Sequence, residues 1–140
     1  MVEVVPLVAL SGSPPAVRFQ KERTMSGNEL AVSRPLYRVN KFAVPDEARE
    51  KFLELVAKTF AVIRRQDGYV RDWVLEQNSG PGIFNFVIMI EFASDEVAPR
   101  IAAALGELDR ELGLDRDALM AELNIRTDFG SYKRLEPLSA

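Results

Sequence analysis

Residues 83–92 read IFNFVIMIEF, and this stretch decides the fold because it is apolar on both faces of the strand that it must form. Every second residue from Phe84 to Phe92 is apolar, and the residues between them are apolar except at Asn85 and Glu91. An antiparallel strand with one face in water alternates apolar and polar residues instead. We therefore predict a sheet covered on one face by helices of the same chain and on the other by a second copy of the protein.

Three further segments are rich in β-branched and aromatic residues and predict the remaining strands: Leu36–Val44, Tyr69–Gln77 and Thr127–Leu135. The segments between the predicted strands have the periodicity of amphipathic helices. The predicted order is strand, helix, strand, strand, helix, short helix, strand. This order indicates an α+β, ferredoxin-like split β-α-β domain with a four-stranded antiparallel sheet and helices on one face. Pairing of two bare sheet faces would complete a dimeric α/β barrel.

Local chemistry places the ends of the helices. Pro45 opens the first helix, which presents one apolar stripe and ends at Asp67-Gly68. Ser94 caps the second helix and Gly113 ends it. Asp115 caps the short third helix. The second helix is expected to bury one apolar face, which consists of Val97, Ile101, Leu105, Leu108 and Leu112.

Composition excludes several kinds of site. The 140 residues include no cysteine and no histidine, which removes disulfides, thiolate metal sites, cysteine nucleophiles, the commonest neutral-pH base and any Ser-His-Asp triad. A net charge of -3 with interspersed signs gives no electrostatic footprint for nucleic acid or a membrane surface. We expect no metal and no cofactor, and neither nucleic acid nor a membrane as partner.

The first 33 residues lack strand or helix periodicity and are predicted to be a flexible tail, followed by one domain over residues 34–136 and a short tail over 137–140. Met25 is a candidate start of the native protein. An alternative is that Val2–Leu10 adds a strand or swaps onto the partner subunit. No secretory signal is recognised, so a cytoplasmic location is expected.

Short signatures along the chain resemble the antibiotic biosynthesis monooxygenase domain family. They are YRVNKFAVP at residues 37–45, EAREKF at 47–52, QDGYV at 66–70 and FVIMIEFAS at 86–94, and the resemblance spans about residues 36–135. It implies a dimeric α/β barrel. The family's characterised enzymes include cofactor-free oxygenases of polyketide anthrones and haem-degrading monooxygenases.

The chain departs from the family at two places on the third strand. Where the anthrone oxygenases carry an Asn and, four residues later, a Trp, this chain has Ile88 and Phe92. The haem-degrading branch uses an Asn on the first strand, which Asn40 matches, but Phe92 replaces its Trp and the histidine ligand of haem is missing. The resemblance therefore favours cofactor-free chemistry over haem degradation.

Asn40 and Trp73 are the candidate catalytic residues. An inward-facing Asn40 needs hydrogen-bond partners and can bind a carbonyl or enolate oxygen, although bonding within its own sheet is the structural alternative. Trp73, the only tryptophan, is expected to share its face with Tyr69, Arg71 and Leu75. It can stack on a planar substrate or anchor the core or the dimer interface.

Six residues are candidates for substrate binding. Arg38 and Arg71 can hold a phenolate or carboxylate or form surface ion pairs. The other four can contact an aromatic substrate or simply pack in the sheet: Tyr37, Phe86, Phe92 and Tyr132. Glu91 interrupts an apolar face and is expected either to act as a base with a raised pKa or to pair with a basic residue.

The sequence thus predicts a homodimeric protein that binds a small aromatic or quinone-like molecule between sheet and helices. The leading function is cofactor-independent monooxygenation of an aromatic or polyketide-like substrate. The alternative is a non-catalytic small-molecule-binding or structural homodimer of the same fold.

Overall fold

The computed structural model describes residues 34–138. Residues 1–33, for which a tail was predicted, and residues 139–140 lie outside this range, and residues 133–138 form neither helix nor strand. The described elements follow the predicted order and are β1 (Leu36–Ala43), η1 (Asp46–Ala48), α4 (Arg49–Ile63), β2 (Tyr69–Glu76), β3 (Phe86–Phe92), η2 (Asp95–Val97), α5 (Ala98–Leu112), α6 (Arg116–Glu122) and β4 (Arg126–Tyr132).

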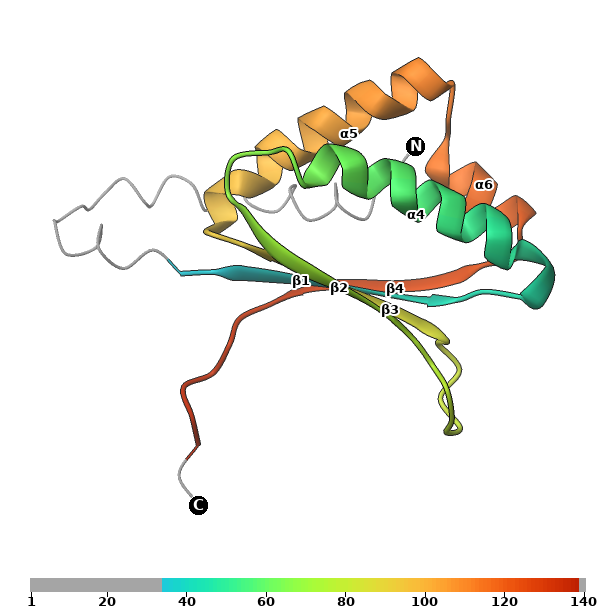
Figure 1. Ribbon diagram of the computed structural model, residues 1–140, viewed down its shortest axis with the longest axis horizontal. Helices are drawn as coiled ribbons and strands as arrows, with labels where there is room; N and C mark the ends of the chain where they lie inside the picture. Colours follow the sequence, from blue (N-terminus) through green and yellow to red (C-terminus); the bar gives the residue numbers. More distant parts are fainter. Residues whose placement is uncertain (1–33, 139–140) are drawn as a thin grey trace, which may run out of the picture.

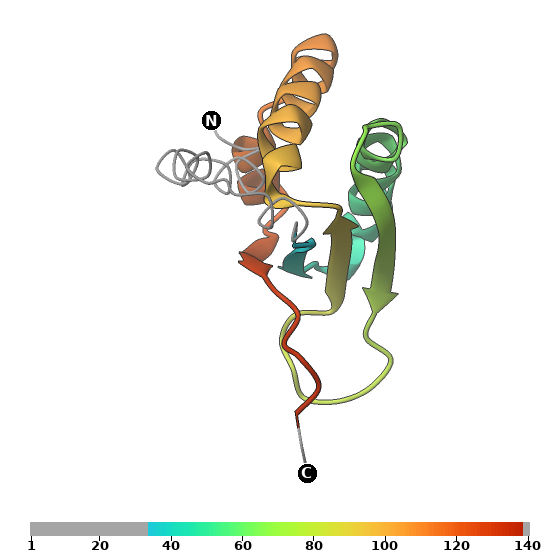
Figure 2. The same cartoon turned by 90° about the vertical axis from the view of Figure 1, so that its left-hand side faces the viewer.

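The four strands form one antiparallel sheet in the order β2-β3-β1-β4. The α-helices of the described residues, α4, α5 and α6, lie on the same side of it (Figures 1 and 2). This is the predicted α+β ferredoxin-like arrangement. Residues paired across an antiparallel ladder share a face, so the register assigns each side chain to the helix-covered face or to the opposite face, which we call the bare face.

The helix-covered face carries the buried half of β3. Phe86, Ile88, Ile90 and Phe92 are all buried, and they pack with Phe52, Phe60 and Ile63 of α4 and with Ile101 and Leu105 of α5. Two ion pairs also join α4 to β2: Arg49 with Glu76 at 2.7 Å and Arg64 with Asp72 at 2.8 Å. The stretch 83–92, predicted to be apolar on both faces, places its even-numbered residues from Phe86 to Phe92 under the helices.

The predicted helix caps are present. The Ser94 hydroxyl accepts a hydrogen bond from the Glu96 amide, and Asp115 accepts one from Ala118. Gly113 ends α5 in the left-handed conformation, with φ 61°. Pro45 precedes a short 3-10 turn that leads into α4, rather than opening the α-helix itself.

Several details differ from prediction. α4 ends at Ile63, and Gly68 instead sits at φ 97° where a Cβ atom would lie 2.4 Å from Val97 Cγ2. β3 begins at Phe86 because the Asn85 side chain bonds both backbone groups of Val44, accepting at 2.7 Å and donating at 2.9 Å. Leu112, predicted to be buried, is 44% exposed at the end of α5.

The bare face of the sheet is apolar at its centre. Val39, Met89 and Trp73 lie side by side across β1, β3 and β2, and Val87 pairs with Leu75 beside them. Trp73 is 38% and Leu75 50% exposed. Within the described residues no element covers this face (Figure 2).

Among the helices of residues 34–138, none combines the length and apolar character needed to cross a membrane.

Candidate functional site

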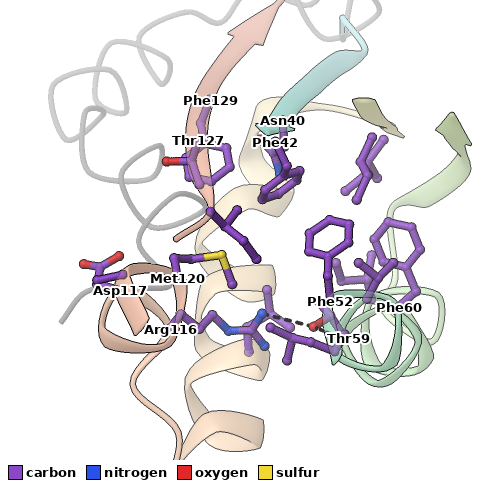
Figure 3. A pocket seen from close by; sticks show the side chains of 18 residues that line it. Asn40, Phe42, Phe52, Thr59, Phe60, Arg116, Asp117, Met120, Thr127 and Phe129 are labelled. Atoms are coloured by element: carbon purple, nitrogen blue, oxygen red, sulfur yellow. Dashed lines mark hydrogen bonds between the residues drawn. The ribbon is translucent and has the colours of Figure 1, made fainter. Parts of the chain in front are cut away.

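A cavity of about 350 Å³ lies between the helix-covered face of the sheet and the helices (Figure 3). This volume is within the range of small-molecule sites. Its walls are mainly apolar and come from β1, β3 and β4 below and from α4, α5 and α6 above. The apolar pocket between sheet and helices that the sequence predicted is therefore present.

Asn40 is the polar residue that the sheet contributes to the deep part of this cavity. It lies at the centre of β1, between Ile88 on β3 and Phe129 on β4, and is 7% exposed. Its Oδ1 atom is buried and accepts no hydrogen bond from the described residues. An unbonded buried carbonyl oxygen costs about 1–3 kcal/mol, and it leaves the cavity with an acceptor that a ligand could use.

A second polar group, formed by Arg116, Asp109 and Thr59, lies on the helix side of the cavity. Arg116 Nε donates to both carboxylate oxygens of Asp109, at 3.0 and 2.9 Å. Arg116 Nη1 donates to the Thr59 hydroxyl at 3.0 Å, and Figure 3 shows this bond. Thr59 in turn donates to the Leu55 carbonyl oxygen. This ion pair joins α6, α5 and α4, and side-chain exposures of 13% and 11% show that it is buried.

The opening of the cavity lies beside α6. Most residues that line the cavity are buried or half-buried, and the exposed ones are Asp117 and Ala121 of α6 and Thr127 of β4. α6 itself has no buried residue. Partial burial raises the pKa of the Asp117 carboxyl above its ordinary value. A ligand entering here would pass a carboxylate before reaching the apolar interior.

Three of the predicted site residues share the helix-covered face with Asn40 but lie outside the cavity wall. Arg38 is 3% exposed, donates to Ser131 Oγ at 3.3 Å and lies 5.9 Å from the centre of the Phe129 ring. Burial lowers the pKa of its guanidinium to about 10. Phe86 and Phe92 are buried core residues, and Phe86 packs on Phe52 with ring centres 5.0 Å apart.

The other predicted site residues lie on the bare face. Trp73, Arg71, Tyr37 and Tyr132 are separated from Asn40 by the sheet. Arg71 forms an ion pair with Glu91 at 3.1 Å and approaches the Trp73 ring at 6.0 Å. The structure therefore does not bring Asn40 and Trp73 together within one subunit.

One prediction about faces is wrong. Tyr69 was expected beside Trp73, but a bulge between Tyr69 and Arg71 inserts one extra residue into β2. Tyr69 consequently pairs with Phe92 on the helix-covered face, where its hydroxyl donates to Asp72. A bulge shifts the side-chain alternation by one residue.

Sequence reasoning missed the polar group on the helix side. Arg116 follows a predicted cap residue and resembles an ordinary surface arginine, while Asp109 sits among the acidic residues of α5. The available signal was Asp109 itself, because it falls on the apolar stripe that includes Leu105 and Leu112. A charged residue in such a stripe requires a buried partner.

The described residues contain no cluster of His, Cys, Asp or Glu suited to a metal ion. Ile88, at the position where the anthrone oxygenases carry an Asn, contributes an aliphatic side chain to the cavity wall. The sheet therefore contributes two polar side chains to the cavity, Asn40 in its buried part and Thr127 near the opening.

No protein-family model matches the chain, and no curated protein sequence matches it. Solved structures do share its fold. A variant of SnoaB, a cofactor-independent oxygenase from Streptomyces nogalater, superposes with a TM-score of 0.58 at 21% identity, over 77% of this chain and 100% of SnoaB. A protein from Shewanella loihica PV-4, provisionally described as a monooxygenase, gives a TM-score of 0.57 at 15% identity, over 76% of this chain and 99% of that protein. At these identities the likeness establishes the fold, and it confirms the resemblance at that level.

Proposed function

We propose that this protein is a cofactor-independent monooxygenase acting on a small aromatic or polyketide-like substrate bound in the cavity between sheet and helices. The observation that carries the proposal is Asn40, whose buried Oδ1 accepts no hydrogen bond from the described residues and lines a mainly apolar cavity. The fold shared with SnoaB, itself a cofactor-independent oxygenase, supports the same reaction class.

The chemistry needs few protein groups. An electron-rich substrate with an acidic C–H bond loses a proton to water or to a nearby group, and the carbanion reduces dioxygen and forms a carbon–oxygen bond with it. Loss of water then leaves a new carbonyl, so that a methylene group and one O₂ give a ketone and one H₂O. The Asn40 amide would hold the substrate oxygen on which negative charge develops. An apolar chamber favours this step because hydrogen bonds to a developing charge are stronger away from water.

We also propose that the working form is a homodimer joined through the bare face. Val39, Trp73, Val87 and Met89 would otherwise leave a contiguous apolar patch in water. In this arrangement Trp73 and Tyr132 are interface residues rather than catalytic ones. Sedimentation velocity at micromolar concentration should give a dimer, and a folded monomer would contradict this part of the proposal. The cytoplasmic location stays a prediction.

The alternative is a non-catalytic binding protein of the same fold. It is favoured by one observation, the aliphatic side chain of Ile88 at the position of the catalytic Asn in the resembled family. Oxygen uptake with a panel of anthrones and hydroquinones separates the two functions. Turnover above the buffer rate that is lost in Asn40→Leu supports the oxygenase. Saturable binding without any oxygen consumption supports the binding protein.

A further inference from the structure

Met120 of α6 supplies the only easily oxidised side chain among the described residues that line the cavity. The other lining residues include no Cys, His, Trp or Tyr. Met120 is half-buried and packs against the hydrophobic core, and Figure 3 shows its thioether extending from α6 into the cavity. Trp73, which can also be oxidised, lies across the sheet on the bare face. An oxidant formed inside the cavity therefore has the Met120 sulfur as its nearest reactive partner.

The proposed reaction forms such an oxidant. Addition of the carbanion to dioxygen gives an organic hydroperoxide, which becomes the ketone only when it loses water. A thioether reacts with a hydroperoxide to give a sulfoxide. The sulfur lone pair attacks the terminal oxygen, so the O–O bond breaks, an S=O bond forms and the proton of the terminal oxygen moves to the substrate alkoxide. Sulfur loses two electrons, the peroxide gains them, and the substrate leaves as an alcohol instead of a ketone.

We infer that Met120 is a site of oxidative modification by the hydroperoxide formed in the cavity, and that its sulfoxide ends turnover in that molecule. Oxidation converts a flexible apolar side chain into a polar one. In a mainly apolar cavity this change weakens the binding of an aromatic substrate, because the sulfoxide oxygen must give up its hydration when the substrate covers it. The inference rests on the proposed function, because the hydroperoxide is an intermediate of that reaction. Met120 is a modification site here and not a catalytic residue.

Turnover under ¹⁸O₂ tests the inference. The full-length protein is incubated with the substrate that gives the fastest oxygen uptake, catalase removes free hydrogen peroxide, and digested peptides are analysed by mass spectrometry. We expect ¹⁸O-sulfoxide at Met120 and one ¹⁸O-labelled alcohol for each sulfoxide formed. Met89 is the internal control, because it is also half-buried but lies on the bare face, and it should stay unlabelled.

The outcomes of this experiment separate the inference from the proposed function. Oxygen uptake without label at Met120, or with equal labelling of Met120 and Met89, would overturn the inference and leave the oxygenase standing. Absence of oxygen uptake with every anthrone and hydroquinone would overturn the proposed function, and the inference with it.

A hydroperoxide supplied from outside tests the site without catalysis. Cumene hydroperoxide is an apolar aromatic molecule that suits a mainly apolar cavity of about 350 Å³, whereas hydrogen peroxide reaches any accessible sulfur. The rate of Met120 oxidation divided by that of Met89 should be at least about tenfold higher with cumene hydroperoxide than with hydrogen peroxide. The same quotient for both oxidants would overturn the inference, because binding in the cavity would then give Met120 no advantage.

Variants connect the modification to the loss of activity. Met120→Leu removes the sulfur and nearly conserves volume, so this variant should keep its own initial rate for at least about fivefold more turnovers than the wild type. Met89→Leu is the matched control and should slow as the wild type does. If Met120→Leu slows at the wild-type pace, its sulfoxide does not end turnover and the inference fails. If Met120→Leu does not fold by circular dichroism, the isotope labelling of the wild type decides the question.

Discussion

Replacement of Asn40 by Leu should make the protein more stable while removing its function. Leu has the same branched arrangement of side-chain heavy atoms as Asn, and the substitution eliminates a buried carbonyl oxygen that accepts no hydrogen bond from the described residues. The penalty for such an oxygen is about 1–3 kcal/mol, so we expect the free energy of unfolding to rise by about 1–2 kcal/mol. With a urea m-value of about 2 kcal/mol per molar, the midpoint should move up by roughly 0.5–1 M.

Asn85→Leu is the matched control, because it is the same substitution on a fully bonded asparagine. The Asn85 amide bonds the Val44 backbone at 2.7 and 2.9 Å, and Val44 is 5% exposed. Its loss leaves a buried N–H and a buried C=O without partners, so we expect a decrease of about 2–4 kcal/mol. Both variants are unfolded in urea at one protein concentration, because dimerisation would couple stability to concentration.

Opposite signs for the two variants are the decisive result. If Asn40→Leu were destabilised as strongly as Asn85→Leu, Oδ1 of Asn40 would have a partner in solution, and the case for a ligand-binding amide would fail. A stabilised Asn40→Leu that still consumes oxygen at the wild-type rate would instead remove Asn40 from the reaction.

Three further results are expected. Met89→Lys places a charge at the centre of the bare face, so sedimentation velocity should show a shift from dimer to monomer with the far-UV circular dichroism retained. Gly68→Ala should lower the free energy of unfolding by about 2 kcal/mol or more, because the new methyl group would lie 2.4 Å from Val97 Cγ2 and φ at this position is 97°. In urea unfolding, the double variant with Val97→Ala should recover part of this loss. The hydrogen bond from Arg64 holds the pKa of Asp72 below its ordinary 3.8, so this carboxylate stabilises the fold above that pH and the contribution disappears as the pH falls further; Asp72→Asn should flatten the acid limb of a stability-against-pH curve.

Much of the fold was predictable because it is encoded in short segments. The caps at Ser94 and Asp115 depend on one side chain and an amide two or three residues away. The apolar run in residues 83–92 predicted a strand with apolar side chains on both faces, and β3 has buried or half-buried residues throughout. Helix caps and strand patterns depend on residues that are neighbours in the sequence, so they can be recognised from the sequence alone.

The site was less predictable because it depends on contacts between distant residues. Arg116 donates a hydrogen bond to Thr59, 57 residues earlier in the sequence, and the sequence around neither residue indicates this contact. The face of Trp73 relative to Tyr69 was assigned by strict alternation, which the bulge in β2 breaks. Asn40 was the predicted site residue that lines the cavity, because an inward-facing asparagine needs hydrogen-bond partners and was therefore a candidate from the sequence.

The bulge in β2 has an evolutionary consequence. Tyr69 pairs with Phe92 and Arg71 with the adjacent Glu91, so Val70 is the residue without a counterpart on β3. Deletion of Val70 would leave every other side chain of β2 on the same face of the sheet as now. Deletion of a later residue of β2 would instead move the side chains on one side of the deletion to the opposite face. We therefore expect homologous chains to vary in length by one residue at this point and to keep a constant length through the rest of the strand.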